Sequence, residues 1–204
     1  MPHNKTPQQI WDLLKEGNKR FAGQSPEHPH SYAERREELQ SGQDPIAAVL
    51  ACSDSRAPVE LIFDTGFGDL FVVRTAGECT DAAVLGSLEF AVKNLNIGLI
   101  VVLGHESCGA VGAAIAATKN GEVPVDSQRV FIEKIVPSVL ESKIDSDIEA
   151  ENVEAAHAAI TADQLITRIP SIHQALHAGE LGVVAARYRL SDGRIEEVVK
   201  HGVV

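Results

Sequence analysis

Four short runs of apolar residues mark the middle and the end of the chain. They are nearly continuous rather than alternating with polar residues, and they cover 46–52, 69–75, 96–105 and 180–190. An apolar run of this length without alternation is typical of a strand that is buried on both faces, as strands of parallel sheets are. The pattern therefore predicts about four parallel strands.

Segments with helical spacing of apolar residues lie between these runs. Helices are expected at 58–64, 81–95 and 107–118, and in a long alanine-rich region from about Asp147 to Ala178. Strands that alternate with helices define an α/β fold with right-handed crossovers and helices flanking the sheet. A Ser-Asp-Gly turn at 191–193 precedes the last apolar segment, which predicts an antiparallel edge strand at the C-terminus.

The first 42 residues are expected to form a helical arm ahead of the sheet. Thr6 and Pro7 have the types preferred at the N-cap and first position of a helix, and an amphipathic pattern that includes Trp11 follows them. A loop rich in Ser, Pro and His leads to a charged helical stretch, 32–40, with the character of solvated surface.

The composition favours one compact domain, 1–204, and excludes several classes of function. The chain has 204 residues, of which 44% are hydrophobic, and 18 Lys+Arg against 29 Asp+Glu give a net charge of -11. A surface this acidic repels nucleic acid and anionic membranes. We find no run of about 18 apolar residues, and the first residues lack the pattern of a signal peptide. A cytoplasmic protein is expected.

The three cysteines are an odd number in a chain that has enough apolar residues for a core, so no disulfide framework is expected. A free cysteine is usually a small buried hydrophobe, and Cys79 has no partner at a metal-like spacing. The acidic segment 141–154 is expected to be a solvated helix surface.

Two of the predicted strands end in residue types that commonly bind metals. Cys52 follows the first strand directly, and His105 and Cys108 follow the third, three residues apart where strand passes into helix. Ligands gather beyond the carboxyl ends of parallel strands, so these side chains converge if the two strands are neighbours. A lone His-x-x-Cys pair is weak evidence, but two thiolates and an imidazole together select zinc over magnesium or calcium.

Asp54 and Arg56 lie beside the first of these ligands. A carboxylate there can orient a zinc-bound hydroxide toward a substrate, or can displace the water and become the fourth ligand. Arg56 can hold Asp54 by a bidentate pair and so act as a gate. An ordinary loop ion pair is the alternative.

The motif CSDSR, followed by GDLFVVRTAG and then HESCGA, resembles the β-class carbonic anhydrases from about residue 45 to 116. The resemblance implies one Zn²⁺ per subunit on Cys52, His105 and Cys108, an Asp54–Arg56 dyad, and reversible hydration of carbon dioxide to bicarbonate and a proton. Zn²⁺ with an open position lowers the pKa of its water to about 7.

Further residues match the resemblance with less weight. Gln43 and the backbone N–H of Gly109 correspond to donors to the substrate, and Phe71 to a residue that lines the carbon dioxide pocket across a subunit boundary. Trp11 corresponds to a residue that packs on a neighbouring subunit, as the arm 1–42 is expected to do. The resemblance thus implies a homodimer or homotetramer.

Three other functions stay open at this point. Cys52 or Cys108 can be a covalent nucleophile with His105 as its base, although Arg56 lies closer to Cys52 than in oxyanion-binding cysteine loops. The zinc can be structural, with Asp54 closing the site. Hydrolysis of carbonyl sulfide or carbon disulfide would use the same ligands within the family.

Overall fold

A five-stranded sheet forms the centre of the molecule, in the order β2-β1-β3-β4-β5. The computed structural model describes residues 5–142 and 149–204. The strands are β1 (Ala47–Cys52), β2 (Leu70–Thr75), β3 (Leu99–His105), β4 (Gly182–Tyr188) and β5 (Ile195–His201). Strands β1 to β4 are parallel, and β5 pairs antiparallel with β4. The predicted mostly parallel sheet with an antiparallel C-terminal edge is confirmed.

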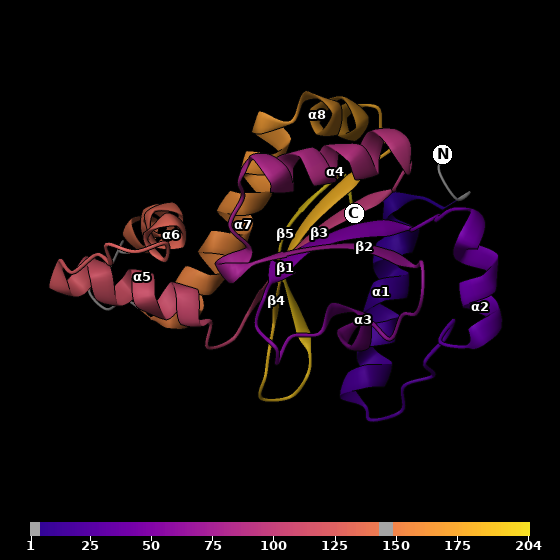
Figure 1. The fold of residues 1–204 in the computed structure, drawn as a ribbon, viewed down its shortest axis with the longest axis horizontal. Helices are drawn as coiled ribbons and strands as arrows, with labels where there is room; N and C mark the ends of the chain where they lie inside the picture. The colour runs from indigo at the N-terminus through magenta and orange to yellow at the C-terminus, as the bar shows by residue number, and fades with distance from the viewer. Residues whose placement is uncertain (1–4, 143–148) are drawn as a thin grey trace.

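Helices cover both faces of the sheet (Figure 1). They are α1 (Pro7–Ala22), α2 (Ala33–Glu38), α3 (Val59–Ile62), α4 (Ala82–Asn94), α5 (Gly109–Asn120), α6 (Arg129–Glu141), α7 (Ala150–Arg168) and α8 (Pro170–His177). Apolar residues of α1 and α3 fill the core on one face, and those of α4, α7 and α8 fill it on the other. A third apolar cluster joins α5, α6 and the beginning of α7 to the three cysteines.

The first helix begins as the sequence predicts. Thr6 is the N-cap, and its side chain and that of Gln9 each accept a hydrogen bond from the other residue's backbone N–H, with Pro7 at the first helical turn. Trp11 is fully buried against Phe63 of the same chain, and its indole N–H donates to Glu197 over 2.7 Å. The expectation that Trp11 packs on a neighbouring subunit is therefore wrong for this side chain.

The strand β2 differs from the expectation of burial on both faces. All six of its residues are partly exposed, whereas those of β1, β3 and β4 are buried throughout. The reason is its place at the edge of the sheet, next to β1 alone. Burial of the interior strands matches the apolar runs that predicted them.

The helices after α5 depart most from the prediction. The expected elements did not include α6, which contains Pro137, a residue that removes a backbone donor and weakens the helical signal. The predicted helix from Asp147 to Ala178 is two helices, because Pro170 begins α8 at a break in the chain direction. Its predicted start at Asp147 lies outside the described residues, as does the part of the acidic segment at 143–148.

The order of the strands fixes where a ligand can bind. The chain enters the sheet at β1, crosses to β2 on one side, and then crosses back to β3 on the other. Beyond the carboxyl ends of such a pair, the connections leave in opposite directions and a crevice opens. In the described residues, no helix is long and apolar enough to cross a membrane.

Asp64 connects the loop after α1 to the end of α3. Its carboxylate accepts hydrogen bonds from Arg20 Nε at 2.6 Å and from the backbone N–H groups of Glu27 and His28. Burial alone would raise the pKa of Asp64, but these donors outweigh it and lower the pKa below its ordinary value.

We expect Asp64→Ala to lower the free energy of unfolding by roughly 2–3 kcal/mol at neutral pH, since charge-assisted bonds are lost. Urea titration measures the change. The loss should shrink as the pH falls through the pKa of Asp64 in the folded protein, because the wild-type carboxylate then takes up a proton. Glu16→Ala, which removes an exposed pair with Lys19, is the control and should change stability by less than about 1 kcal/mol. An equal effect of the two substitutions would contradict this account.

Candidate metal centre

Three ligand-type side chains meet beyond the carboxyl ends of β1 and β3. The sulfur atoms of Cys52 and Cys108 and a ring nitrogen of His105 all lie within 4.8 Å of one another, and all three residues are buried. The strands are neighbours in parallel register, with Ala51 opposite Leu103. The sequence predicts that these three side chains converge if the two strands are neighbours. The strands are neighbours, and the side chains do converge.

The loop after β1 is held from the edge strand. Arg74 of β2 donates from Nε to the carbonyl of Cys52 at 2.9 Å and from Nη2 to the carbonyl of Asp54 at 2.6 Å. The backbone N–H of Ser53 donates to the carbonyl of Thr75 at 2.9 Å. These bonds fix the backbone on both sides of Cys52, so its side chain is presented in one direction.

The loop after β3 turns sharply and is held through Glu106. Ser107 has a φ of 56°, in the left-handed region, which reverses the chain between His105 and Cys108. The backbone N–H of Glu106 donates to the carbonyl of Tyr188 at 2.8 Å, and its carboxylate accepts from the N–H of Ser191 at 2.9 Å. Cys108 is then the N-cap of α5, whose partial positive charge favours a thiolate.

His105 has the hydrogen bonding of a metal ligand. Its Nδ1 lies 2.9 Å from the carbonyl oxygen of Glu106, so this nitrogen carries the proton and donates it. The opposite nitrogen, Nε2, is buried, has no hydrogen-bond partner and is left with its lone pair. A ligating histidine usually donates its other N–H to a carbonyl in this way. An orphaned imidazole nitrogen next to two thiols fits a soft divalent cation well.

The two thiols perturb each other. A hydrogen bond between them, with smaller help from His105 and the N–H of Gly77, lowers the pKa of Cys52 below its ordinary value. The same bond, together with burial, raises the pKa of Cys108. The cause is that two negative charges cannot be held so close together without a compensating cation. A divalent ion between the sulfurs would supply that charge.

Asp54 and Arg56 form a forked pair at the opening of the trio. Arg56 donates from Nε to Oδ1 at 2.9 Å and from Nη2 to Oδ2 at 2.7 Å, and its backbone N–H also reaches Oδ1. The Arg56 side chain holds the pKa of Asp54 well below its ordinary range. Asp54 Oδ2 lies 3.9 Å from His105 Nε2. An ionised carboxylate thus stands beside the candidate metal position.

The other residues that the sequence singles out are not all near the trio. Gly109 begins α5 immediately after Cys108, and its position is exposed. Gln43 precedes β1 and so lies at the opposite end of this strand from Cys52. Phe71 lies on β2 opposite Ala48 and packs against Phe90. The single chain does not bring Gln43 or Phe71 to its own cysteines, so their predicted roles require a second chain.

Two buried carboxylates near the site were missed from the sequence. Glu78 is 1% exposed, and its Oε2 has no hydrogen-bond partner. Burial, reinforced by the charge of Cys52, raises the pKa of Glu78 to about 8. Glu154 is 2% exposed, so the expectation that the segment 141–154 is solvated surface is wrong at this residue. No periodic signal marks either residue, and the partner that compensates Glu154, Arg187, is distant in the sequence.

Cys79 is a buried thiol whose pKa is raised to about 12 by that burial. It is not among the three ligand-type residues that meet, in agreement with a structural role. The hydroxyl of Thr75 donates to the carbonyl of Cys79 at 2.8 Å and closes the turn after β2.

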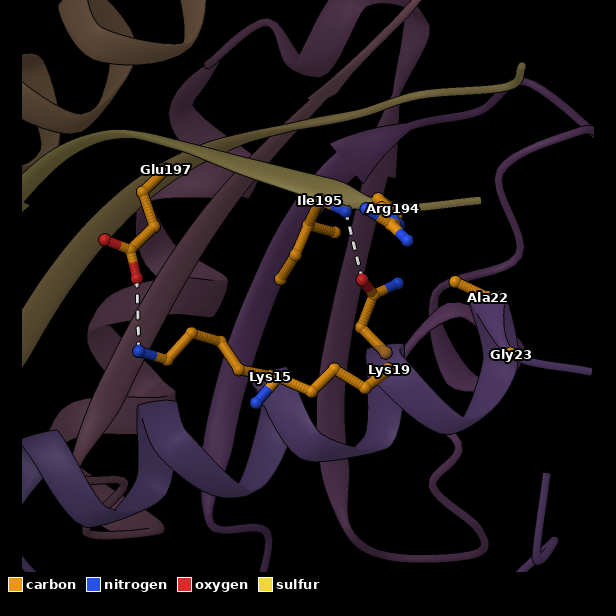
Figure 2. Close-up of a pocket in the computed structure, with 8 residues that line it drawn as sticks. Lys15, Lys19, Ala22, Gly23, Arg194, Ile195 and Glu197 are labelled. Carbon is orange, nitrogen blue, oxygen red and sulfur yellow. Dashed lines mark hydrogen bonds and ion pairs between the residues drawn. The ribbon is translucent and has the colours of Figure 1, made fainter. Parts of the chain in front are cut away.

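A groove of about 600 Å³ lies between α1 and the start of β5 (Figure 2). Its lining includes three basic side chains, Lys15, Lys19 and Arg194. Lys15 is paired with Glu197, as Figure 2 shows, and Lys19 with Glu16. None of the three candidate ligands lines this groove, so it is separate from the metal centre.

The fold and the site together define an α/β protein with a buried Cys-His-Cys group that could hold a metal ion at the carboxyl edge of its sheet. A family model described as carbonic anhydrase matches residues 47–195. Carbonic anhydrase 2 of Mycobacterium tuberculosis is 46% identical over 191 residues, which cover 94% of this chain and 92% of that protein. The chain therefore belongs to the β-carbonic anhydrase family, a family of lyases.

Solved structures agree with this assignment. The β-carbonic anhydrase CcaA matches with a TM-score of 0.69 at 28% identity and covers 92% of this chain and 86% of its own. One of two β-carbonic anhydrases from Sordaria macrospora, described as tetrameric, matches with a TM-score of 0.69 at 23% identity and covers 93% and 98% of the two chains. At this identity the second match shows the fold alone.

The buried Glu78 should make metal-free protein less stable as the pH rises. Its pKa is about 8 when folded against an ordinary 4.5, so the folded state binds the extra proton between these values and the free energy of unfolding falls across that range. We expect Glu78→Gln to remove the fall and to be more stable at alkaline pH by about 2–4 kcal/mol. Urea titration of chelator-treated protein from acid to alkaline pH measures this. Glu60→Gln, at an exposed position, is the control, and parallel curves for wild type and Glu78→Gln would contradict the prediction.

Proposed function

We propose that this chain is a zinc enzyme that reversibly hydrates carbon dioxide to bicarbonate and a proton. Cys52, His105 and Cys108 would hold one Zn²⁺ per subunit. The observation that carries the proposal is the orphaned His105 Nε2 between two thiols, with ionised Asp54 beside it. When bound by three protein ligands, Zn²⁺ lowers the pKa of water to about 7 and so supplies a nucleophile at neutral pH.

Asp54 has the properties of an orienting acceptor. Its low pKa keeps it ionised, so it can only accept hydrogen bonds. Both of its oxygens already receive donors from Arg56, yet Oδ2 remains 3.9 Å from His105 Nε2. A carboxylate held at that position can accept a hydrogen bond from the attacking water and so direct a lone pair toward the carbon of carbon dioxide.

Arg56 would keep Asp54 from becoming a fourth metal ligand. Besides the forked pair, its Nη2 donates to the carbonyl of Ser107 at 3.1 Å, on the loop that carries the other two ligands. The guanidinium thus spans the two ligand loops. This arrangement supports the orienting role of Asp54 over its role as a fourth ligand.

Substrate contacts and assembly belong to the same proposal. Gly109 offers a backbone N–H at the exposed start of α5, whereas Gln43 and Phe71 would reach a site only from a neighbouring subunit. A homodimer or homotetramer with the arm 1–42 at the contact would meet this requirement, and the tetrameric relatives from Sordaria macrospora support it. The cytoplasmic location stays a prediction.

The test of the proposed function is stopped-flow hydration of carbon dioxide by protein of measured zinc content. We expect about one zinc per chain and activity that rises with pH as bound water loses its proton. A cysteine nucleophile would instead give alkylation-sensitive protein without zinc, and a structural zinc would give metal without activity at any pH. Either result would overturn the proposal.

We expect Arg56→Ala to keep its zinc but to lose about 10²–10³-fold in kcat/KM, since Asp54 is then free to approach the metal. Metal analysis and the hydration assay measure the two effects separately. Arg56→Lys should recover little of the lost activity, because an ammonium group cannot form the forked pair with Asp54. Arg36→Ala, at an exposed position on α2, is the control. A fully active Arg56→Ala would rule out this role.

Complementation tests the role of Gln43 across a subunit boundary. A hybrid of a Gln43→Ala subunit and an Arg56→Ala subunit contains one site that carries neither substitution if Gln43 serves its neighbour. We expect such hybrids, purified by two different tags, to be more active than either variant alone in the hydration assay. Hybrids of the double variant Gln43→Ala/Arg56→Ala with Arg56→Ala are the control, and equal activities would show that Gln43 does not act on a neighbouring site.

A further inference from the structure

The helix α7 carries two buried polar side chains behind the metal centre. Glu154 and His157 are 2% and 3% exposed, and they lie three residues apart, so they share one face of the helix. Burial of a carboxylate and an imidazole is costly unless hydrogen bonds satisfy them. Their hydrogen-bond partners show which parts of the chain the two side chains hold in place.

Glu154 holds the loop of Cys108. Its Oε1 accepts the backbone N–H of Cys108 at 3.2 Å, and its Oε2 accepts from Arg187 Nε at 2.8 Å. Arg187 is itself buried on β4 and also pairs with Glu151 and Glu196 through Nη1. The carboxylate of Glu154 is thus compensated from the sheet, while its other oxygen is directed at the backbone of a candidate ligand.

His157 acts in the same way on the loop that faces Cys52. Its Nε2 donates to the carbonyl of Gly77 at 2.9 Å, and its Nδ1 lies 3.0 Å from the hydroxyl of Ser138, which donates to it. The backbone N–H of Gly77 in turn donates to Cys52 Sγ at 3.3 Å. His157 therefore fixes Gly77, whose backbone N–H donates a hydrogen bond to the Cys52 sulfur.

The residue at 77 has little freedom to move. Gly77 has a φ of 62°, and a Cβ there would lie 2.8 Å from Ile135 Cδ1 and 2.9 Å from Ala110 Cβ. A glycine is required by the left-handed conformation and by this close approach. Because α5 and α6 close over it from one side, the hydrogen bond from His157 is well placed to set its orientation.

We propose that α7 is the positioning helix of the metal centre, with Glu154 and His157 as positioning residues for the Cys108 and Cys52 thiolates respectively. Neither residue touches the metal position. Each acts through one backbone N–H, that of Cys108 itself or that of Gly77. The inference rests on the proposed function to the extent that the ligand is a zinc ion, but it concerns metal affinity rather than hydration of carbon dioxide.

A merely structural role for the buried pair makes a different prediction. Replacement of a buried ion pair by apolar side chains of similar size is often neutral or stabilising. The double variant Glu154→Met/Arg187→Met removes both charges, so no uncompensated ion is left buried. If the pair serves stability alone, this protein folds and binds zinc as wild type does.

We expect the double variant and His157→Leu to bind zinc about 10–100-fold more weakly than wild type. Competition with a chromophoric chelator measures the affinity, and the cobalt-substituted proteins should show altered thiolate-to-metal absorption. The controls are Glu151→Met, which removes another carboxylate from Arg187 on the same helix, and His173→Leu at an exposed position on α8. Both controls should match wild type.

Folded variants with wild-type zinc affinity would overturn the inference. Where a variant fails to fold, hydrogen exchange of metal-free wild type decides: the amides of Cys108 and Gly77 should be strongly protected, and fast exchange of both would overturn it. The proposed function fails separately, through wild-type protein that binds zinc without hydrating carbon dioxide.

Discussion

The parallel pairing of β1 with β3 is the constraint on which the rest of the structure depends. It places the ends of two apolar strands side by side, and Cys52 and His105 are the last residues of those strands. Their backbones are paired as part of a sheet whose interior strands are fully buried. The metal centre therefore inherits the rigidity of the core, and only the two short loops beyond it need further support.

Support comes from three directions, and each supplies a different kind of contact. Arg74 on the edge strand holds carbonyl groups of the first loop, and Arg56 joins the first loop to the second. From α7, the carboxylate of Glu154 accepts a hydrogen bond from the backbone N–H of Cys108, and the imidazole of His157 donates one to the carbonyl of Gly77. The two thiols lie beside His105, and burial, together with the charges of Cys52 and Glu154, raises the pKa of Glu78. Such a concentration of acidic groups is suited to a cation.

The sequence predicted what depends on local pattern. Continuous apolar runs identified the four parallel strands, and the Thr6–Pro7 cap located the start of α1 within one residue. The ligand trio was accessible because its members directly follow strands. The burial of Glu154 could not be predicted in this way, because a glutamate in an acidic helical stretch has the pattern of solvated surface. Its partner, Arg187, lies on a strand distant in the sequence. The roles of Gln43 and Phe71 depend on a second chain, which no pattern in one chain can position.

The bonds of Arg74 have a consequence for folding. Successive side chains of a strand point to opposite faces, so a slip of β2 against β1 by one residue would turn Arg74 away from the carbonyl groups of Cys52 and Asp54. Since β2 is a partly exposed edge strand, its core contacts discriminate weakly between registers. In the wrong register, Arg74 would lose its hydrogen bonds to these carbonyl groups, and the pairing would be less stable. The side chain that orders the loop after β1 thereby also favours the correct register at the edge of the sheet.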